Sequence, residues 1–213
     1  MKDKTIKYEH KANTKEYLVA LTSIPRFVKM LESENKPYKK LHDWLVTNEQ
    51  LFSDDNQEFP SVKQIAEWTD IDSGHVSKQI KQMYHDIHIL NQNSPQLFVK
   101  EGQKMCSLNF DYLGSMAQFN LGLDVIPRVG DGFYFWFIKP INGGTIFHVK
   151  NVTHSLDKGD HEIWISLTSD YPNAYMELLK EKAYLHREIS FSDLLSNTSS
   201  SLEEELVKRH RNL

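Results

Sequence analysis

The strongest periodic pattern in the chain lies between Asp72 and Ile87. Apolar residues recur there at intervals of four, three and four positions, at Val76, Ile80, Met83 and Ile87. This spacing places them on one side of an α-helix. The opposite side is polar and basic and carries Gly74, Lys78, Lys81 and His85. We therefore expect an amphipathic helix with a buried apolar stripe and an exposed basic face.

A second, shorter helix is predicted just before it. Ser61 is a favourable N-cap, and Gln64 three residues later completes a capping box. Helical spacing then relates Val62, Ile65, Ala66 and Thr69. The pattern breaks after Thr69, where Asp70 tolerates a left-handed backbone and Asp72 can cap the next helix. The stretch predicts two helices joined by a tight turn.

This pair of helices resembles the helix-turn-helix of winged-helix DNA-binding proteins. The matching positions are Ala66, Ile71 in the turn, the Val76–Ser77 pair ten residues after Ala66, and Ile80 four residues after Val76. Asp70 stands where the family usually has glycine. The resemblance implies that the second helix, Asp72 to Ile87, enters a groove of double-stranded DNA. Its site residues would be Ser73, Gly74, His75, Ser77, Lys78, Gln79, Lys81 and Gln82.

The segment after this helix predicts the wing. Two β-like runs, Leu97–Val99 and Met105–Leu108, flank a turn over Lys100–Lys104. By the same resemblance, the wing from Leu97 to Leu108 would contact DNA through Lys100, Gln103 and Lys104. We expect a winged helix-turn-helix domain over residues 36–112, with a helix that opens at Pro37.

The resemblance implies a sequence-specific, DNA-binding regulator of transcription. A replication or mobile-element initiator uses the same fold, and the sequence does not separate the two. A protein-interaction adaptor, whose winged-helix fold binds protein and not DNA, is the alternative from a different class. The formal net charge is −4, from 25 basic and 29 acidic residues, so we expect a modest and salt-sensitive affinity for DNA.

The pattern becomes strand-like in the C-terminal half. Phe133–Phe137 is an aromatic run, and residues 145–152 and 162–168 alternate between apolar and polar. Tight turns separate these runs, which is typical of a small antiparallel barrel. Residues 128–131 resemble the entry to an SH3-like barrel, to which we assign residues 125–169. The predicted fold class is α+β, with residues 1–35 as an N-terminal arm and helix and residues 111–124 as a linker.

Two surfaces are candidates for partner binding. If Phe133–Phe137 is one strand, Tyr134 and Trp136 point to the face opposite the phenylalanines. The C-terminal segment, residues 170–213, predicts helices, one of which has an apolar face with Tyr175, Met176, Leu179 and Ala183. Either surface could support a homodimer.

Candidate catalytic chemistry is sparse. The single cysteine, Cys106, excludes an internal disulfide and a cysteine-based zinc cluster. The ten histidines lack helical metal-site spacing, and neither a nucleophile elbow nor a phosphate loop occurs. We expect a non-enzymatic protein with no metal and no cofactor. The charged N-terminus and the short longest apolar run, Phe133–Ile138, predict a cytoplasmic, bacterial protein without a membrane span.

Overall fold

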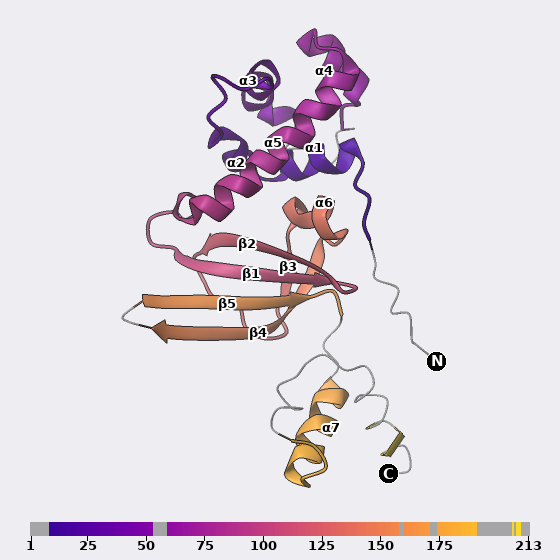
Figure 1. The fold of residues 1–213 in the computed structure, drawn as a ribbon, viewed down its shortest axis with the longest axis vertical. Coiled ribbons are helices and arrows are strands. Elements are labelled where there is room, and N and C mark those ends of the chain that lie inside the picture. Colours follow the sequence, from indigo (N-terminus) through magenta and orange to yellow (C-terminus); the bar gives the residue numbers. More distant parts are fainter. Residues whose placement is uncertain are drawn as a thin grey trace. The chain divides into compact units, whose positions relative to one another are not determined.

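The computed structural model describes residues 9–52, 59–157, 160–170, 174–190, 206 and 208–209. The chain divides into two compact units, residues 1–170 and 171–213. In the first unit a helical part precedes a five-stranded sheet (Figure 1). The predicted α+β class is therefore confirmed.

The helical part begins with α1 (Thr14–Ser23) and α2 (Pro25–Lys29). Asn13 and Glu16 form a capping box at the start of α1, so this segment is a helix and not a strand. Proline fits the first turn of α2, where its missing N–H has no helical partner to lose. Two elements follow, α3 (Lys39–Thr47) and the 3-10 helix η1 (Glu49–Phe52).

The next two helices, α4 (Val62–Thr69) and α5 (Ser73–Asn93), form the predicted pair. Ser61 caps α4 together with Gln64, and Asp70 ends it in the left-handed conformation, with φ 49° and ψ 51°. The Asp72 carboxylate accepts hydrogen bonds from two backbone N–H groups in the first turn of α5. The predicted caps and turn are therefore present, although α5 continues to Asn93, beyond the predicted end at Ile87.

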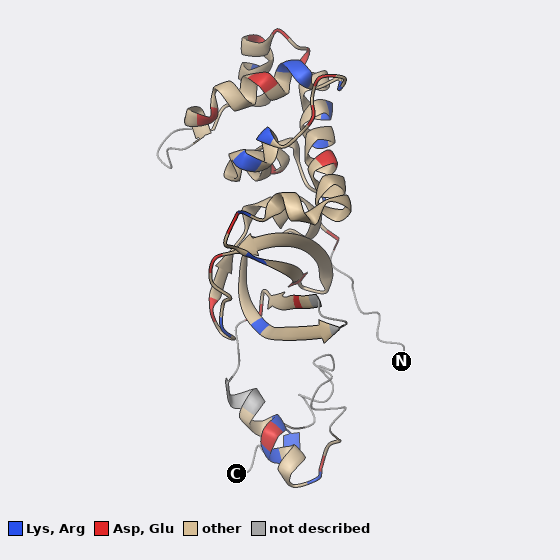
Figure 2. Cartoon of the chain, turned by 90° about the vertical axis from the view of Figure 1, so that its left-hand side faces the viewer, with Lys and Arg blue, Asp and Glu red and all other residues tan. Residues whose placement is uncertain are grey.

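Five strands form one curled sheet, whose half-barrel shape is visible in Figure 2. They are β1 (Lys104–Tyr112), β2 (Ser115–Leu123), β3 (Gly132–Tyr134), β4 (Ile146–Asp157) and β5 (Asp160–Thr168). Their order is β2-β1-β5-β4-β3, and only the β1–β5 pair is parallel. The first strand in the sequence therefore lies beside the last one, and β2 forms the edge beyond it.

The core lies between the helices and one face of the sheet. Phe27 of α2 packs against the rings of Phe98, Phe119 and Phe137, with ring centroids 4.9, 5.5 and 5.5 Å away. All four side chains are almost completely buried. Since these residues come from both the helices and the sheet, the two parts of the first unit share one core.

The predicted wing is wrong. Leu97–Val99 is not a strand, because Pro95 opens a 3-10 helix, η2 (Pro95–Phe98), and Phe98 is buried in the aromatic core. Met105–Leu108 belongs to β1, which pairs with β2 and β5. The predicted linker is likewise a β-hairpin, whose turn contains Leu113 and Gly114 with positive φ values of 51° and 81°.

The closed SH3-like barrel over residues 125–169 is also corrected. Those residues supply three strands of the five-stranded half-barrel, β3, β4 and β5. The aromatic run is not one strand either, because β3 ends at Tyr134 and a short 3-10 helix, η3 (Trp136–Ile138), follows. Pro140 lies in the first turn of α6 (Lys139–Asn142), which comes next in the chain.

The second unit contains α7 (Ala174–Leu185). Leu179 and Ala183, on its predicted apolar face, are buried, as is Leu206. Burial of Leu179 makes it unavailable as a partner surface in this conformation, while the side chains of Tyr175 and Met176 lie outside the described residues. Across the described part of the chain, every helix is too short or too polar to cross a lipid bilayer.

Candidate nucleic-acid interface

The first half of α5 presents the exposed polar surface that the sequence predicts. Val76, Ile80 and Met83 are fully buried against the helical part and fix the rotation of the helix. The opposite side is open to solvent. We call this surface the α5 face, and it consists of Gly74, His75, Lys78, Lys81, Gln82 and His85.

Three predicted site residues lie at the edges of this face. Ser77 and Gln79 are half-buried, and the Gln79 side-chain oxygen is enclosed without a hydrogen-bond partner among the described residues. Ser73 is exposed at the first position of α5. Of the two glutamines proposed to read bases, Gln82 is therefore the accessible one.

Side chains of α3 contact both the turn before α5 and the helix α4. The Lys40 ammonium on α3 donates to the backbone carbonyl of Asp70, at 3.2 Å, and lies 3.5 Å from the Asp70 carboxylate. Trp44 of α3 stacks on Trp68 of α4 with ring centroids 5.8 Å apart. These contacts attach α3 to α4 and to the turn that follows it.

The carboxylate beside the α5 face is already engaged. Asp86 accepts hydrogen bonds from the Lys36 ammonium at 2.9 Å and from the Tyr38 hydroxyl at 2.7 Å. Burial, followed by the hydrogen bond to Asp86, raises the pKa of Tyr38, so its hydroxyl stays protonated and donates. Since Asp86 has these partners, its negative charge is partly offset.

The second half of α5 is anchored to the sheet side of the core. The Tyr84 hydroxyl donates to the Phe137 carbonyl at 2.7 Å, so the His88 Nε2–H, 3.1 Å away, donates to the Tyr84 oxygen. The Asn91 side chain pairs with both backbone groups of Asn120 on β2, at 2.7 and 2.9 Å. Burial, with a smaller contribution from His85, lowers the pKa of His88 to about 4.

The predicted wing residues do not join the α5 face. The 21 residues of α5 span about 30 Å, and Lys100 follows its C-terminal end, whereas the α5 face starts at its N-terminal end. Gln103 accepts a hydrogen bond from the backbone N–H of Lys100 and donates to Asp124, at the end of β2. Lys104 starts β1.

The other predicted partner surface is exposed. Tyr134 and Trp136 have exposed fractions of 71% and 46%, and the Lys139 ammonium lies 5.2 Å from the centre of the Trp136 ring. Sequence reasoning missed Lys139 and Tyr17 of α1 as neighbours of these sites. No local pattern marks them, because their positions depend on how α1 packs between α5 and η3.

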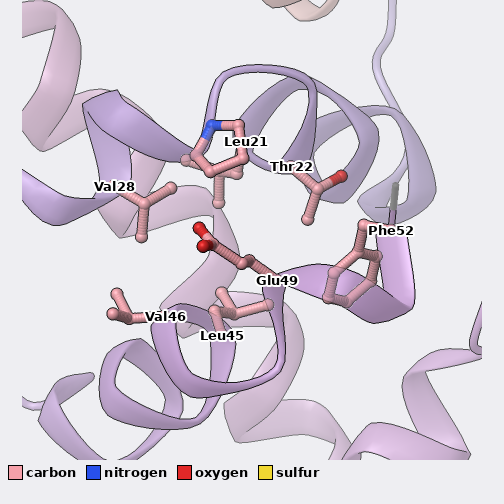
Figure 3. A pocket seen from close by; sticks show the side chains of 8 residues that line it. Leu21, Thr22, Val28, Leu45, Val46, Glu49 and Phe52 are labelled. Carbon is pink, nitrogen blue, oxygen red and sulfur yellow. The ribbon is translucent and has the colours of Figure 1, made fainter.

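Two hollows of the first unit differ greatly in size. The cavity in Figure 3 is lined by Leu21, Val28, Leu45 and Phe52 among others, and its volume of about 10 Å³ admits about one water molecule. Glu49 borders it but is paired with Lys29 at 2.7 Å. A wider, open hollow of about 410 Å³ lies at the α4–α5 turn. Within the residues described, no three histidine, cysteine or acidic side chains gather as a metal site would require.

Comparison with known proteins assigns the chain to no family. No family model matches the sequence, and neither a curated protein nor a solved structure shows significant similarity to it.

Proposed function

We propose that this protein binds double-stranded DNA through the α5 face and acts as a sequence-specific regulator of transcription. The observation that carries the proposal is the combination of a capped, tightly turned helix pair with an open, basic face on its second helix. An α-helix fits the major groove of DNA, where its exposed side chains meet base edges and phosphates. The proposal has no wing, because η2 and β1 occupy that segment.

The residues of the α5 face suit different parts of a DNA site. Lys78 and Lys81 would contact phosphates, which supply most of the affinity without reading sequence. Gln82, which follows Lys81 and lies one helical turn after Lys78, is exposed and can form two hydrogen bonds with adenine in the major groove. Because the whole chain carries a net charge of −4, long-range attraction to DNA is weak and local contacts must supply the affinity.

The test begins with selection of binding sites from a random duplex library by the full-length protein. We expect one sequence to be enriched, with an affinity that falls steeply as salt is added. Lys78→Ala and Lys81→Ala should each weaken binding to all sequences and lower the salt slope by about one. Gln82→Ala should instead relax discrimination at one base pair. The difference in binding free energy between the preferred and other base pairs there should shrink by about 1–3 kcal/mol.

Lys100→Ala provides the matched control, since it removes the same charge beyond the far end of α5. Wild-type affinity and salt slope are expected for this variant. If it weakens binding as much as the α5 variants do, the α5 face is not the site. Failure to bind any duplex at low salt would favour the protein-interaction adaptor, and selective binding to an origin or element end would favour the initiator.

A further inference from the structure

A row of contacts connects the α5 face to the aromatic residues that follow β3. The Lys81 ammonium lies 5.7 Å from the centre of the Tyr17 ring on α1. Glu16, next to Tyr17, lies 3.7 Å from the Lys139 ammonium, which in turn lies 5.2 Å from the centre of the Trp136 ring. The α1 helix therefore bridges the two surfaces, and Figure 1 shows it between α5 and α6.

The aromatic end of this row is an exposed apolar patch. Tyr134 and Trp136 flank Phe135, whose backbone is extended, so their side chains leave the chain on the same side, roughly 7 Å apart at Cα. Ile146 pairs with Tyr134 across the strands and is 51% exposed. β3 is an edge strand of the sheet.

Flat exposed rings beside a cation have a specific use in nucleic-acid binding. Unpaired bases stack on aromatic side chains whatever their sequence, and a nearby lysine meets the phosphates between them. The bases of a duplex are already stacked on one another, so they are not available to such rings. The patch therefore suits a single strand, whereas the α5 face suits a duplex.

We propose that Tyr134, Trp136 and Lys139 bind single-stranded DNA that continues from a duplex held on the α5 face. The protein would then recognise a junction between double-stranded and single-stranded DNA, with α1 lying beside the point of separation. This inference rests on the proposed function for the duplex part and adds a second site of different chemistry.

The composition of the patch favours this occupant over a second copy of the chain. A stable dimer interface buries at least about 1,000 Å² in total, and three large side chains around a three-residue strand supply only part of that area. The Lys139 ammonium beside Trp136 offers a positive charge that complements a phosphate. Glu16, the carboxylate in this row, lies between Lys139 and His10 and is mostly buried.

The experiment measures the affinity of the full-length protein for three DNA probes by fluorescence anisotropy. The probes are a blunt duplex of mixed sequence at low salt, the same duplex with short unpaired extensions at both ends of one strand, and the extension alone. Stacking of one or two bases should make the extended duplex bind about tenfold more tightly than the blunt one. Trp136→Ala and Tyr134→Ala should remove this gain and leave the affinity for the blunt duplex unchanged.

Trp164→Ala is the matched control. Trp164 is 37% exposed on β5, and it points to the sheet face opposite its buried neighbours Ile163 and Ile165. This variant should keep the full gain from the extension. Tyr134 is 71% exposed, so Tyr134→Ala is the substitution least able to disturb folding. If Trp136→Ala does not fold, the affinities of Tyr134→Ala decide the test.

The outcomes separate the two proposals. An extension that adds no affinity, or a gain that survives both aromatic substitutions, overturns the single-strand site and leaves the duplex proposal standing. Binding of the extension without any binding of the blunt duplex, if lost in Trp136→Ala, supports this site and refutes the duplex proposal. Absence of all binding refutes both. A dimer that Trp136→Ala converts to a monomer, with all affinities unchanged, identifies the patch as a subunit interface and overturns the inference.

Discussion

His88 is a titratable side chain enclosed by aromatic rings. Its ring centroid lies 4.9 Å from that of Tyr84, 5.5 Å from that of Phe119 and 5.3 Å from that of Phe137. Its hydrogen bond to Tyr84 fixes the neutral tautomer with the proton on Nε2. Protonation would add a charge to an apolar site, which explains why the pKa of His88 is lowered.

This environment predicts a specific loss of stability in acid. The unfolded chain binds a proton at His88 below its ordinary pKa of 6.5, but the native protein does so only near pH 4. Stability should therefore fall as the pH decreases from about 6.5 to 4, by up to about 3 kcal/mol from this residue. Urea unfolding between pH 4 and 7.5 measures the effect. His88→Gln should flatten that part of the profile.

Asp70 carries the strain of the turn between α4 and α5. With φ at 49°, it occupies a conformation that disfavours most side chains, although aspartate tolerates it better than alanine. Asp70→Ala should therefore lower the free energy of unfolding by about 1 kcal/mol, while Asp70→Gly should retain at least the native value. Denaturant midpoints of the three proteins provide the comparison. Equal losses in both variants would indicate that the contact with Lys40 matters more than the backbone conformation.

At the scale of elements, local signals predicted the helix pair and the strands within residues 145–152 and 162–168, but they missed β2 and the pairing of the strands. The Ser61 cap, the Asp72 cap and the buried stripe from Val76 to Ile87 depend on residues close in the sequence, so the pattern contained them. Phe98 is buried against Phe27 and Phe119, which are distant in the sequence. Because the local pattern contains neither contact, the short apolar run around Phe98 could be assigned to a wing strand. The parallel pairing of β1 with β5 is equally non-local.

The candidate site shows the same division. The exposed side of α5 follows from its own periodicity, so Lys78, Lys81 and Gln82 could be selected in advance. The placement of Lys100 and Lys104 depended on the wing and changed with it. Exposure of Tyr134 and Trp136 agrees with the predicted alternation, but the packing of η3, which begins at Trp136, against α1 is a tertiary contact that no local pattern marks.

These differences predict how fragments will behave. A chain of residues 36–112, the expected winged-helix domain, keeps β1 but lacks both strands that flank it, and it lacks Phe27 beside Phe98. We expect this fragment to show no cooperative unfolding by circular dichroism. Stable folding and DNA binding by residues 36–112 alone would contradict the shared core that the structure shows.

At the scale of the whole molecule, the division at residue 170 predicts an independent first unit. A chain ending at Asp170 retains every element of the shared core, from α1 to β5. We expect it to unfold in one transition with a midpoint close to that of the first unit in the full chain, and to bind the same DNA probes with the same affinities. If truncation abolishes DNA binding while the fold is kept, the second unit contributes to the site, for example by holding two copies together.

The Asn91 side chain has a consequence for solution behaviour. An outermost β-strand offers unpaired backbone groups to which another chain can add, and this is a common route to aggregation. By pairing with both groups of Asn120, Asn91 occupies the middle of the outer side of β2, and η2 with Val99 lies against Gly122 further along. The C-terminal half of this edge is therefore closed to strand addition. Asn91→Ala would reopen this edge. We expect the variant to aggregate at high concentration, seen as turbidity, before its circular dichroism spectrum changes.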